Sequence, residues 1–88
     1  MTEDQFSQVL AEEGFTEART VDFEPDMDGE LHTHEFSAMS MVVKGELTLT
    51  YEVGSETFTA GQSCGLVAGT VHAERTGPSG ATILVGTK

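Results

Sequence analysis

Basic residues and cysteine are both scarce in this chain of 88 residues. Four lysines and arginines stand against fifteen aspartates and glutamates, which gives a formal net charge of −11 at pH 7. Such a surface repels phosphate and attracts cations, so we expect no nucleic-acid partner and no membrane partner. The one cysteine, Cys64, leaves no internal disulfide and no cysteine-rich zinc module, which suits a reducing cytosol.

Long apolar runs are missing as well. None approaches the roughly 20 residues that a membrane helix needs. The first residues, Met1-Thr2-Glu3-Asp4, are acidic where a secretory signal is basic, so a cytoplasmic location is expected. A chain of 88 residues is long enough for one domain with a single modest core.

Residues 2–13 have the pattern of a short amphipathic helix. Thr2 suits the N-cap, Gln5 stands three residues later as in a capping box, and Gly14 suits the C-terminal end. Phe6 and Leu10 share one face at helical spacing. We therefore divide the chain into an N-terminal helical segment, residues 1–15, and a single domain, residues 16–88.

After residue 16 the apolar residues recur at every second position, as they do on a β-strand. Residues 46–53 alternate strictly, with Leu47, Leu49, Tyr51 and Val53 on one face, and Gly54-Ser55 then suits a two-residue hairpin turn. Further strands are predicted at 63–67, 71–76 and 81–85, and Gly45 is expected to break the extended stretch 31–44. Seven or eight short strands with glycine-rich turns predict an all-β sandwich or barrel with one leading helix.

The stretch 38–44 is apolar on both faces. Ala38, Ser40 and Val42 alternate with Met39, Met41 and Val43. A strand buried on both sides needs the barrel interior on one side and a second covering element on the other. That covering element is either the helix of residues 2–13 or a second subunit, and we predict a homodimer.

The three histidines carry the strongest chemical signal. His32 and His34 stand at i and i+2, so on an extended strand both rings project to the same side. His72 opens another predicted strand, and antiparallel pairing could bring it beside the other two. Three neutral imidazoles on one side of a cation leave positions open for water or substrate. An HxH pair is also found by chance on surface strands, so ordinary surface or core histidines stay an alternative.

At this point the chain resembles the cupin superfamily. The run Gly29, His32-Thr33-His34 and Gly45 is similar to the first cupin motif, and Gly61, Val67-Ala68-Gly69 and His72 are similar to the second. The resemblance implies a small jelly-roll β-barrel. It also implies one divalent transition metal (Fe, Ni, Cu, Zn or Mn) held by His32, His34 and His72.

Several positions depart from the family pattern. Ala38 stands where the family has a glutamate ligand, Val67 replaces a proline and Thr76 replaces an asparagine. The expected metal ligands are therefore three histidines, as in the group of three-histidine cupins to which thiol and diketone dioxygenases belong. Loss of the carboxylate should weaken the site for hard cations.

Tyr51 and Glu74 are weaker candidates for catalytic roles. Glu74 shares strand parity with His72 and could act as a base or as a partner of the ligands, with a rim position as the alternative. Tyr51 could donate a proton to substrate or be a core residue. Cys64 shares parity with Leu66 and is expected to be a small core residue.

Three functions remain open on the sequence alone. The first is a mononuclear transition-metal enzyme, oxygenase-like or isomerase/lyase-like, that acts on a small organic molecule. The second is a non-catalytic cupin that binds or senses a metal or small ligand. The third is a metal-free barrel that serves dimerisation.

Overall fold

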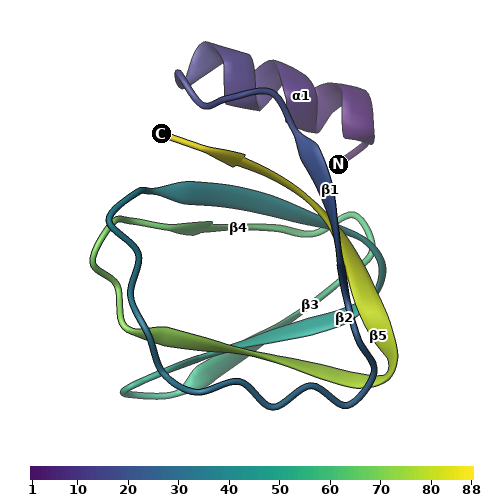
Figure 1. Cartoon of the computed structure of the whole chain (residues 1–88). Coiled ribbons are helices and arrows are strands. Elements are labelled where there is room, and N and C mark those ends of the chain that lie inside the picture. Colours follow the sequence, from purple (N-terminus) through teal and green to yellow (C-terminus); the bar gives the residue numbers. More distant parts are fainter.

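All 88 residues are described by a computed structural model, and they form a strand-rich fold with one helix (Figure 1). This all-β, jelly-roll architecture with a short N-terminal helix confirms the predicted fold class. The elements are, in chain order, α1 (Glu3–Glu12), β1 (Arg19–Phe23), β2 (Ala38–Tyr51), β3 (Ser55–Thr59), β4 (Ser63–Leu66) and β5 (His72–Thr87).

Helix α1 has the predicted capping box. The Thr2 side chain accepts from the Gln5 backbone N–H, and the Gln5 side chain accepts from the Thr2 backbone N–H. These two bonds satisfy amide donors that a helix otherwise leaves unpaired at its start. Gly14 follows the helix at φ 81°, a left-handed conformation that costs glycine little.

The long strands β2 and β5 organise the sheet. Its order is β1-β5-β2-β3, with β4 also paired to β2, and all pairs are antiparallel. The first half of β2 pairs with the second half of β5, and the second half of β2 pairs with the first half of β5. Figure 1 shows both strands bending as they pass from one layer of the roll to the other.

Two expectations about strand ends were wrong. Gly45 does not end its strand, and segments 71–76 and 81–85 belong to one strand, so the structure has five strands in place of seven or eight. Register shifts at Val42/Lys44 and Gly45/Leu47 let the chain bend while pairing continues. Gly45 lies at such a shift with φ 78°, and a Cβ there would lie 2.1 Å from the Gly80 carbonyl oxygen.

The β2–β3 hairpin turns one step earlier than predicted. Thr50 pairs with Ser55, so residues 52–54 connect the two strands and Ser55 already belongs to β3. The Tyr51 amide donates to the Gly54 carbonyl across this turn. Val53, expected on the apolar strand face, is 93% exposed because it lies in the turn.

The two faces of β2 are buried against different partners. Val42, Leu47 and Leu49 belong to the interior cluster, which also contains Ala81, Ile83 and Val85. On the outer face, Met41 is buried with Phe6 and Leu10 of α1. The helix therefore covers the second apolar face, which was one of the two predicted coverings. The homodimer stays a prediction, and this face no longer requires it.

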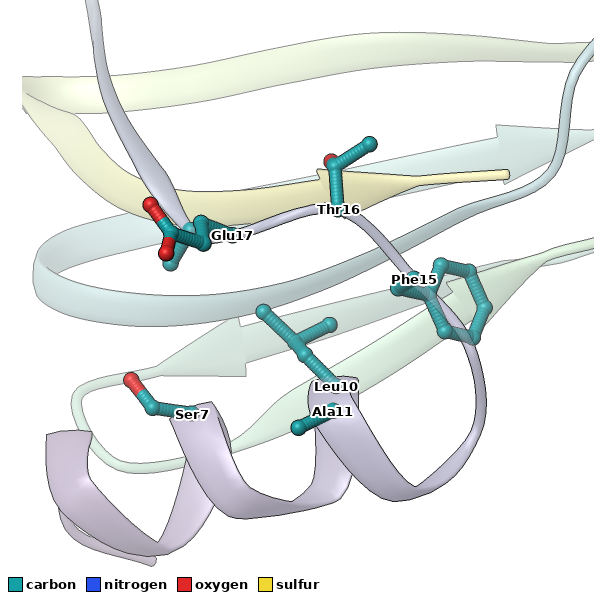
Figure 2. Close-up of a pocket in the computed structure, with 7 residues that line it drawn as sticks. Ser7, Leu10, Ala11, Phe15, Thr16 and Glu17 are labelled. Carbon is teal, nitrogen blue, oxygen red and sulfur yellow. The ribbon is translucent and has the colours of Figure 1, made fainter.

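Helix α1 and the segment after it enclose a pocket of about 430 Å³ (Figure 2). Its apolar lining residues are Leu10, Ala11, Phe15 and Ala18, and Ser7, Thr16 and Glu17 complete the wall. The pocket has no histidine in its walls. No helix of the structure has the length and apolar character needed to cross a membrane.

Candidate metal centre

A single β-bridge places His32 beside His72. The His32 amide donates to the His72 carbonyl at 2.8 Å, and the His72 amide donates back to the His32 carbonyl at 3.0 Å. Two residues that exchange both backbone bonds lie directly opposite each other, with side chains on the same face. The ring centroids of His32 and His72 are consequently 4.5 Å apart.

His32 and His34 lie on an irregular segment before β2, and not on the continuous strand expected for residues 31–44. Strand β2 begins only at Ala38. Glycine at position 29 suits a close approach of two backbones, because its amide donates to the Glu74 carbonyl and a Cβ there would lie 3.0 Å from that oxygen. The segment thus runs close along the start of β5, and the His32 bridge follows from that path.

His34 completes the group of rings, as the sequence predicts. Its carbonyl accepts from the Gly69 amide at 2.9 Å, which ties this residue to the turn before β5. Its ring centroid lies 4.9 Å from that of His32 and 5.2 Å from that of His72. Phe36 stacks on the His34 ring, with the two ring centroids 4.8 Å apart. All three predicted histidines therefore come together.

A carboxylate joins the three rings, and it comes from β5. The ligand atoms of His32, His34, His72 and Glu74 all lie within 4.8 Å of one another. Glu74 was predicted only as a base, a partner of the ligands or a rim residue, so its place inside the group went unforeseen. The signal available was its i, i+2 spacing from His72, which puts both side chains on one face of a strand. Glu74 supplies the carboxylate that Ala38 cannot.

Hydrogen bonds to the backbone fix the tautomers of two rings. Nδ1 of His32 donates to the Glu30 carbonyl at 2.8 Å, and Nδ1 of His72 donates to the Thr70 carbonyl at 2.9 Å. A carbonyl oxygen only accepts, so each Nδ1 carries the proton and each neutral ring presents the Nε2 lone pair to the centre.

Those lone pairs face the Glu74 carboxylate. Nε2 of His32 lies 3.3 Å from one oxygen, and Nε2 of His72 lies 3.2 Å from the other. When both rings are neutral, their Nε2 atoms and the Glu74 oxygens can all only accept hydrogen bonds. A cation among these atoms, either a proton or a metal ion, removes the repulsion between them. A convergent set of nitrogen and oxygen donors with outer-face hydrogen bonds to the backbone is the usual surrounding of a protein-bound transition metal. The residues present therefore fit the metal that the cupin resemblance implies.

Burial of the donors is graded. The His72 side chain is 1% exposed, Glu74 is 19% exposed and His32 is 38% exposed. One side of the group is thus fixed inside the roll, and the other side is reachable from solvent. A bound ion could exchange and could keep a position for a further ligand.

Tyr51 and Cys64 lie outside the group. Tyr51 is directly opposite His72 in the β2–β5 register, so it shares that face of the sheet. Burial raises the pKa of the Tyr51 phenol, and the neighbouring Cys64 and Glu56 raise it further. Burial, and then the charge of Glu56, raise the pKa of the Cys64 thiol to about 11. Cys64 packs against the interior cluster, which agrees with the predicted core role.

A small cavity adjoins the histidine–glutamate group inside the roll. Its volume is about 170 Å³, and both His34 and Glu74 line it. Ala38 also lines it, so the family's glutamate position does face the same space. Small side chains at positions 38 and 40 leave that space open.

Comparison with known proteins agrees with this geometry. A sequence profile for the cupin domain matches residues 19–85, so the chain belongs to the cupin family. No curated protein matches the chain.

Similar solved structures include proteins of several kinds. A protein of unknown function from Rhizobium leguminosarum is 17% identical with a TM-score of 0.74, over 81% of this chain and 67% of its own. An RmlC-like cupin from Shewanella frigidimarina is 27% identical with a TM-score of 0.64, over 81% of this chain and 63% of that one. A polyketide cyclase from Streptomyces resistomycificus is 19% identical with a TM-score of 0.68, over 83% of this chain and 54% of that one. The chain thus spans a little over half to two thirds of these proteins.

Proposed function

We propose that this cupin binds one divalent transition metal through His32, His34, His72 and Glu74. The observation that supports this most is the convergence of four side chains whose ligand atoms all lie within 4.8 Å of one another. The Nδ1 atoms of His32 and His72 bond to backbone carbonyls, so each Nε2 faces a Glu74 oxygen at 3.3 or 3.2 Å, a contact that a metal ion or a proton between the two atoms stabilises.

The donor types narrow the choice of metal. Three imidazoles favour Fe, Ni, Cu and Zn, and the added carboxylate makes Mn a better competitor than a three-histidine site would allow. When bound, an ion of this class polarises a substrate oxygen or lowers the pKa of a bound water.

We further propose that the protein is an enzyme acting on a small organic molecule, in an oxygenase-like or isomerase/lyase-like reaction. The adjoining cavity is mostly apolar, which suits the carbon skeleton of a small organic molecule beside the centre. A raised pKa keeps the Tyr51 phenol protonated at neutral pH, so Tyr51 could hold a proton for donation but would not act as a base.

A non-catalytic binding or sensing module is the second candidate. One observation favours it: besides His34 and Glu74, the only ionisable side chain in the cavity wall is Arg19, which cannot exchange a proton at neutral pH. The cavity thus has few groups for acid–base work.

Metal analysis of the protein purified without a histidine tag tests the proposal. We expect about one transition-metal ion per chain for wild type, and strong loss in His72→Ala because it removes the most buried donor. Glu35→Gln is the matched control, since Glu35 is exposed and outside the group. Equal metal content in all three proteins would overturn the site. Oxygen uptake and product analysis with small thiols, diketones and phenols then separate the enzyme from the binding module.

A further inference from the structure

The cavity beside the metal centre lies between the two layers of the roll. Ala38 comes from the first half of β2, and Ile83 and Val85 come from the second half of β5, which pairs with it. Glu74 comes from the first half of β5, which runs in the other layer (Figure 1). The cavity is therefore polar on its His34–Glu74 side and mostly apolar elsewhere.

The side chains of this cavity offer no buried positive charge. Arg19 belongs to the wall, but it is exposed at the start of β1, so its charge stays in water. The Glu74 carboxylate and the formal net charge of −11 both oppose a negatively charged ligand. An anion would lose its hydration here without gaining a buried side-chain partner, so the walls suit an uncharged ligand.

The cavity volume limits the size of that ligand. It is about 170 Å³, which is smaller than the roughly 300–1,000 Å³ of pockets that hold drug-sized ligands. An apolar cavity of about 150 Å³, lined by leucine, isoleucine and phenylalanine, accepts benzene. One six-membered ring with one small substituent therefore fills this space.

Phe36 lines the cavity on the side that reaches solvent. Its side chain is 41% exposed, and its ring stacks on the His34 ring with an angle of 22° between the two planes. The backbone is held on both sides of Phe36, because the His34 carbonyl accepts from the Gly69 amide and Ser37 exchanges two backbone hydrogen bonds with Lys88. These contacts place the Phe36 ring between the cavity and solvent.

We propose that this cavity binds a phenol with a single ring, and that Phe36 determines this specificity. The ring packs among the apolar side chains, where Phe23 and Phe36 supply aromatic contacts. The hydroxyl group is the one polar end and points to the His34–Glu74 side, where the metal ligands lie. Phe36 limits the ligand to one ring because it occupies the solvent side of the wall. The contact between hydroxyl and metal rests on the proposed metal-dependent function, and the selection by size does not.

Phenol, toluene and 2-naphthol are matched probes. Toluene has the shape of phenol without the hydroxyl group, and 2-naphthol keeps the hydroxyl group and adds a second ring. Zinc affinity is measured first, by competition with a chelator, and each probe is then titrated into metal-free and zinc-loaded protein and followed by the NMR shifts of backbone amides. We expect phenol to bind about tenfold or more tightly than 2-naphthol in both forms, because a second ring overpacks the cavity. Non-specific partition would favour 2-naphthol, which is the more hydrophobic compound. Zinc should raise the affinity for phenol about tenfold and leave that for toluene unchanged.

Variants locate the effect. Phe36→Ala should abolish the preference for phenol over 2-naphthol, because the space of the lost ring admits the second ring. Ala38→Val narrows the cavity and should weaken phenol binding about tenfold. Val67→Ala shortens an exposed apolar side chain outside this cavity, so it is the matched control and should leave both affinities unchanged.

The outcomes separate this proposal from the metal site. If wild type binds 2-naphthol as tightly as phenol, the one-ring specificity is overturned, whatever zinc does. A preference for phenol that survives Phe36→Ala overturns the role of Phe36, and a phenol affinity that zinc leaves unchanged overturns the contact between hydroxyl and metal. Absence of zinc binding, with the Phe36-dependent preference intact in metal-free protein, overturns the proposed metal function alone.

Discussion

Replacement of Glu74 by glutamine should change the stability of the metal-free and zinc-loaded protein in opposite directions. In the metal-free protein with neutral rings, the carboxylate faces two Nε2 lone pairs at 3.2 and 3.3 Å. A glutamine amide can donate a hydrogen bond where the carboxylate cannot. One such bond adds about 0.5–1.5 kcal/mol to the free energy of unfolding. For a domain of this size, 1 kcal/mol raises Tm by about 4–8 °C.

In the zinc-loaded protein the same replacement should lower stability, because it removes one of the metal ligands. Removal of a group outside the ligand set lowers metal affinity about 10–100-fold, so removal of a direct ligand should reach or exceed about 100-fold. With free zinc at 100 times the wild-type Kd, wild type gains about 2.7 kcal/mol of stability. A hundredfold weaker variant gains about 0.4 kcal/mol under the same conditions. The zinc-dependent rise in Tm should therefore fall from about 10 °C or more to a few degrees.

The assay is thermal unfolding at pH 8.5, with and without zinc, for wild type, Glu74→Gln and the control Glu35→Gln. The control makes the same charge change beside His34, outside the group. A Glu74→Gln variant that is less stable without metal and equally stabilised by zinc would refute the reasoning. It would show that the carboxylate serves an ordinary ion pair with a protonated ring.

Three further predictions concern the surroundings of the centre. Phe6→Ala should lower the free energy of unfolding, measured by urea titration, by about 3–5 kcal/mol, because Phe6 is fully buried between α1 and β2. Gln8→Ala, at an exposed position of the same helix, is the neutral control. A loss below about 1 kcal/mol in Phe6→Ala would contradict the packing of α1. Ala38→Glu should lower the Tm of the metal-free protein and make Tm depend more steeply on added metal, because it places a second carboxylate in the cavity wall. If the Tm of this variant does not change with added metal, position 38 does not face the centre. With its thiol pKa raised from 9.0 to about 11 in the folded state, Cys64 should contribute a stability loss of at most about 3 kcal/mol as pH rises from 9 to 11. In Cys64→Ala, denaturant titration should show that this loss of stability between pH 9 and 11 is absent. If the variant and wild type lose the same stability over that range, the burial of the thiol is contradicted.

The parts of the fold that local chemistry determines were predictable from the sequence. The α1 capping box needs only Thr2 and Gln5, and the inner face of β2 follows from simple alternation. Strand ends were less predictable, because a bulge lets a strand bend and continue where glycine alone suggests a break. The turn at residues 52–54 shows the same limit, because Val53 fits the alternating pattern of the strand but lies exposed in the turn.

The candidate site was predictable in its histidines and not in its carboxylate. The HxH spacing and the position of His72 are visible in the sequence, and antiparallel pairing brings His72 beside His32, through one isolated β-bridge in place of two continuous strands. The i, i+2 spacing puts Glu74 on the same strand face as His72, but its contact with His32 depends on the long-range pairing of the start of β5 with the segment of Gly29 and His32. The family's usual carboxylate position on β2 directed attention to Ala38, although the neighbouring strand supplies the group.

A crystal structure of the zinc-loaded protein tests the central claim most directly. We expect one zinc ion with nitrogen ligands from His32, His34 and His72 at about 2.0–2.1 Å and a Glu74 oxygen at about 2.0–2.2 Å. An ion bound elsewhere, or bound by the three histidines with Glu74 turned away, would contradict the account.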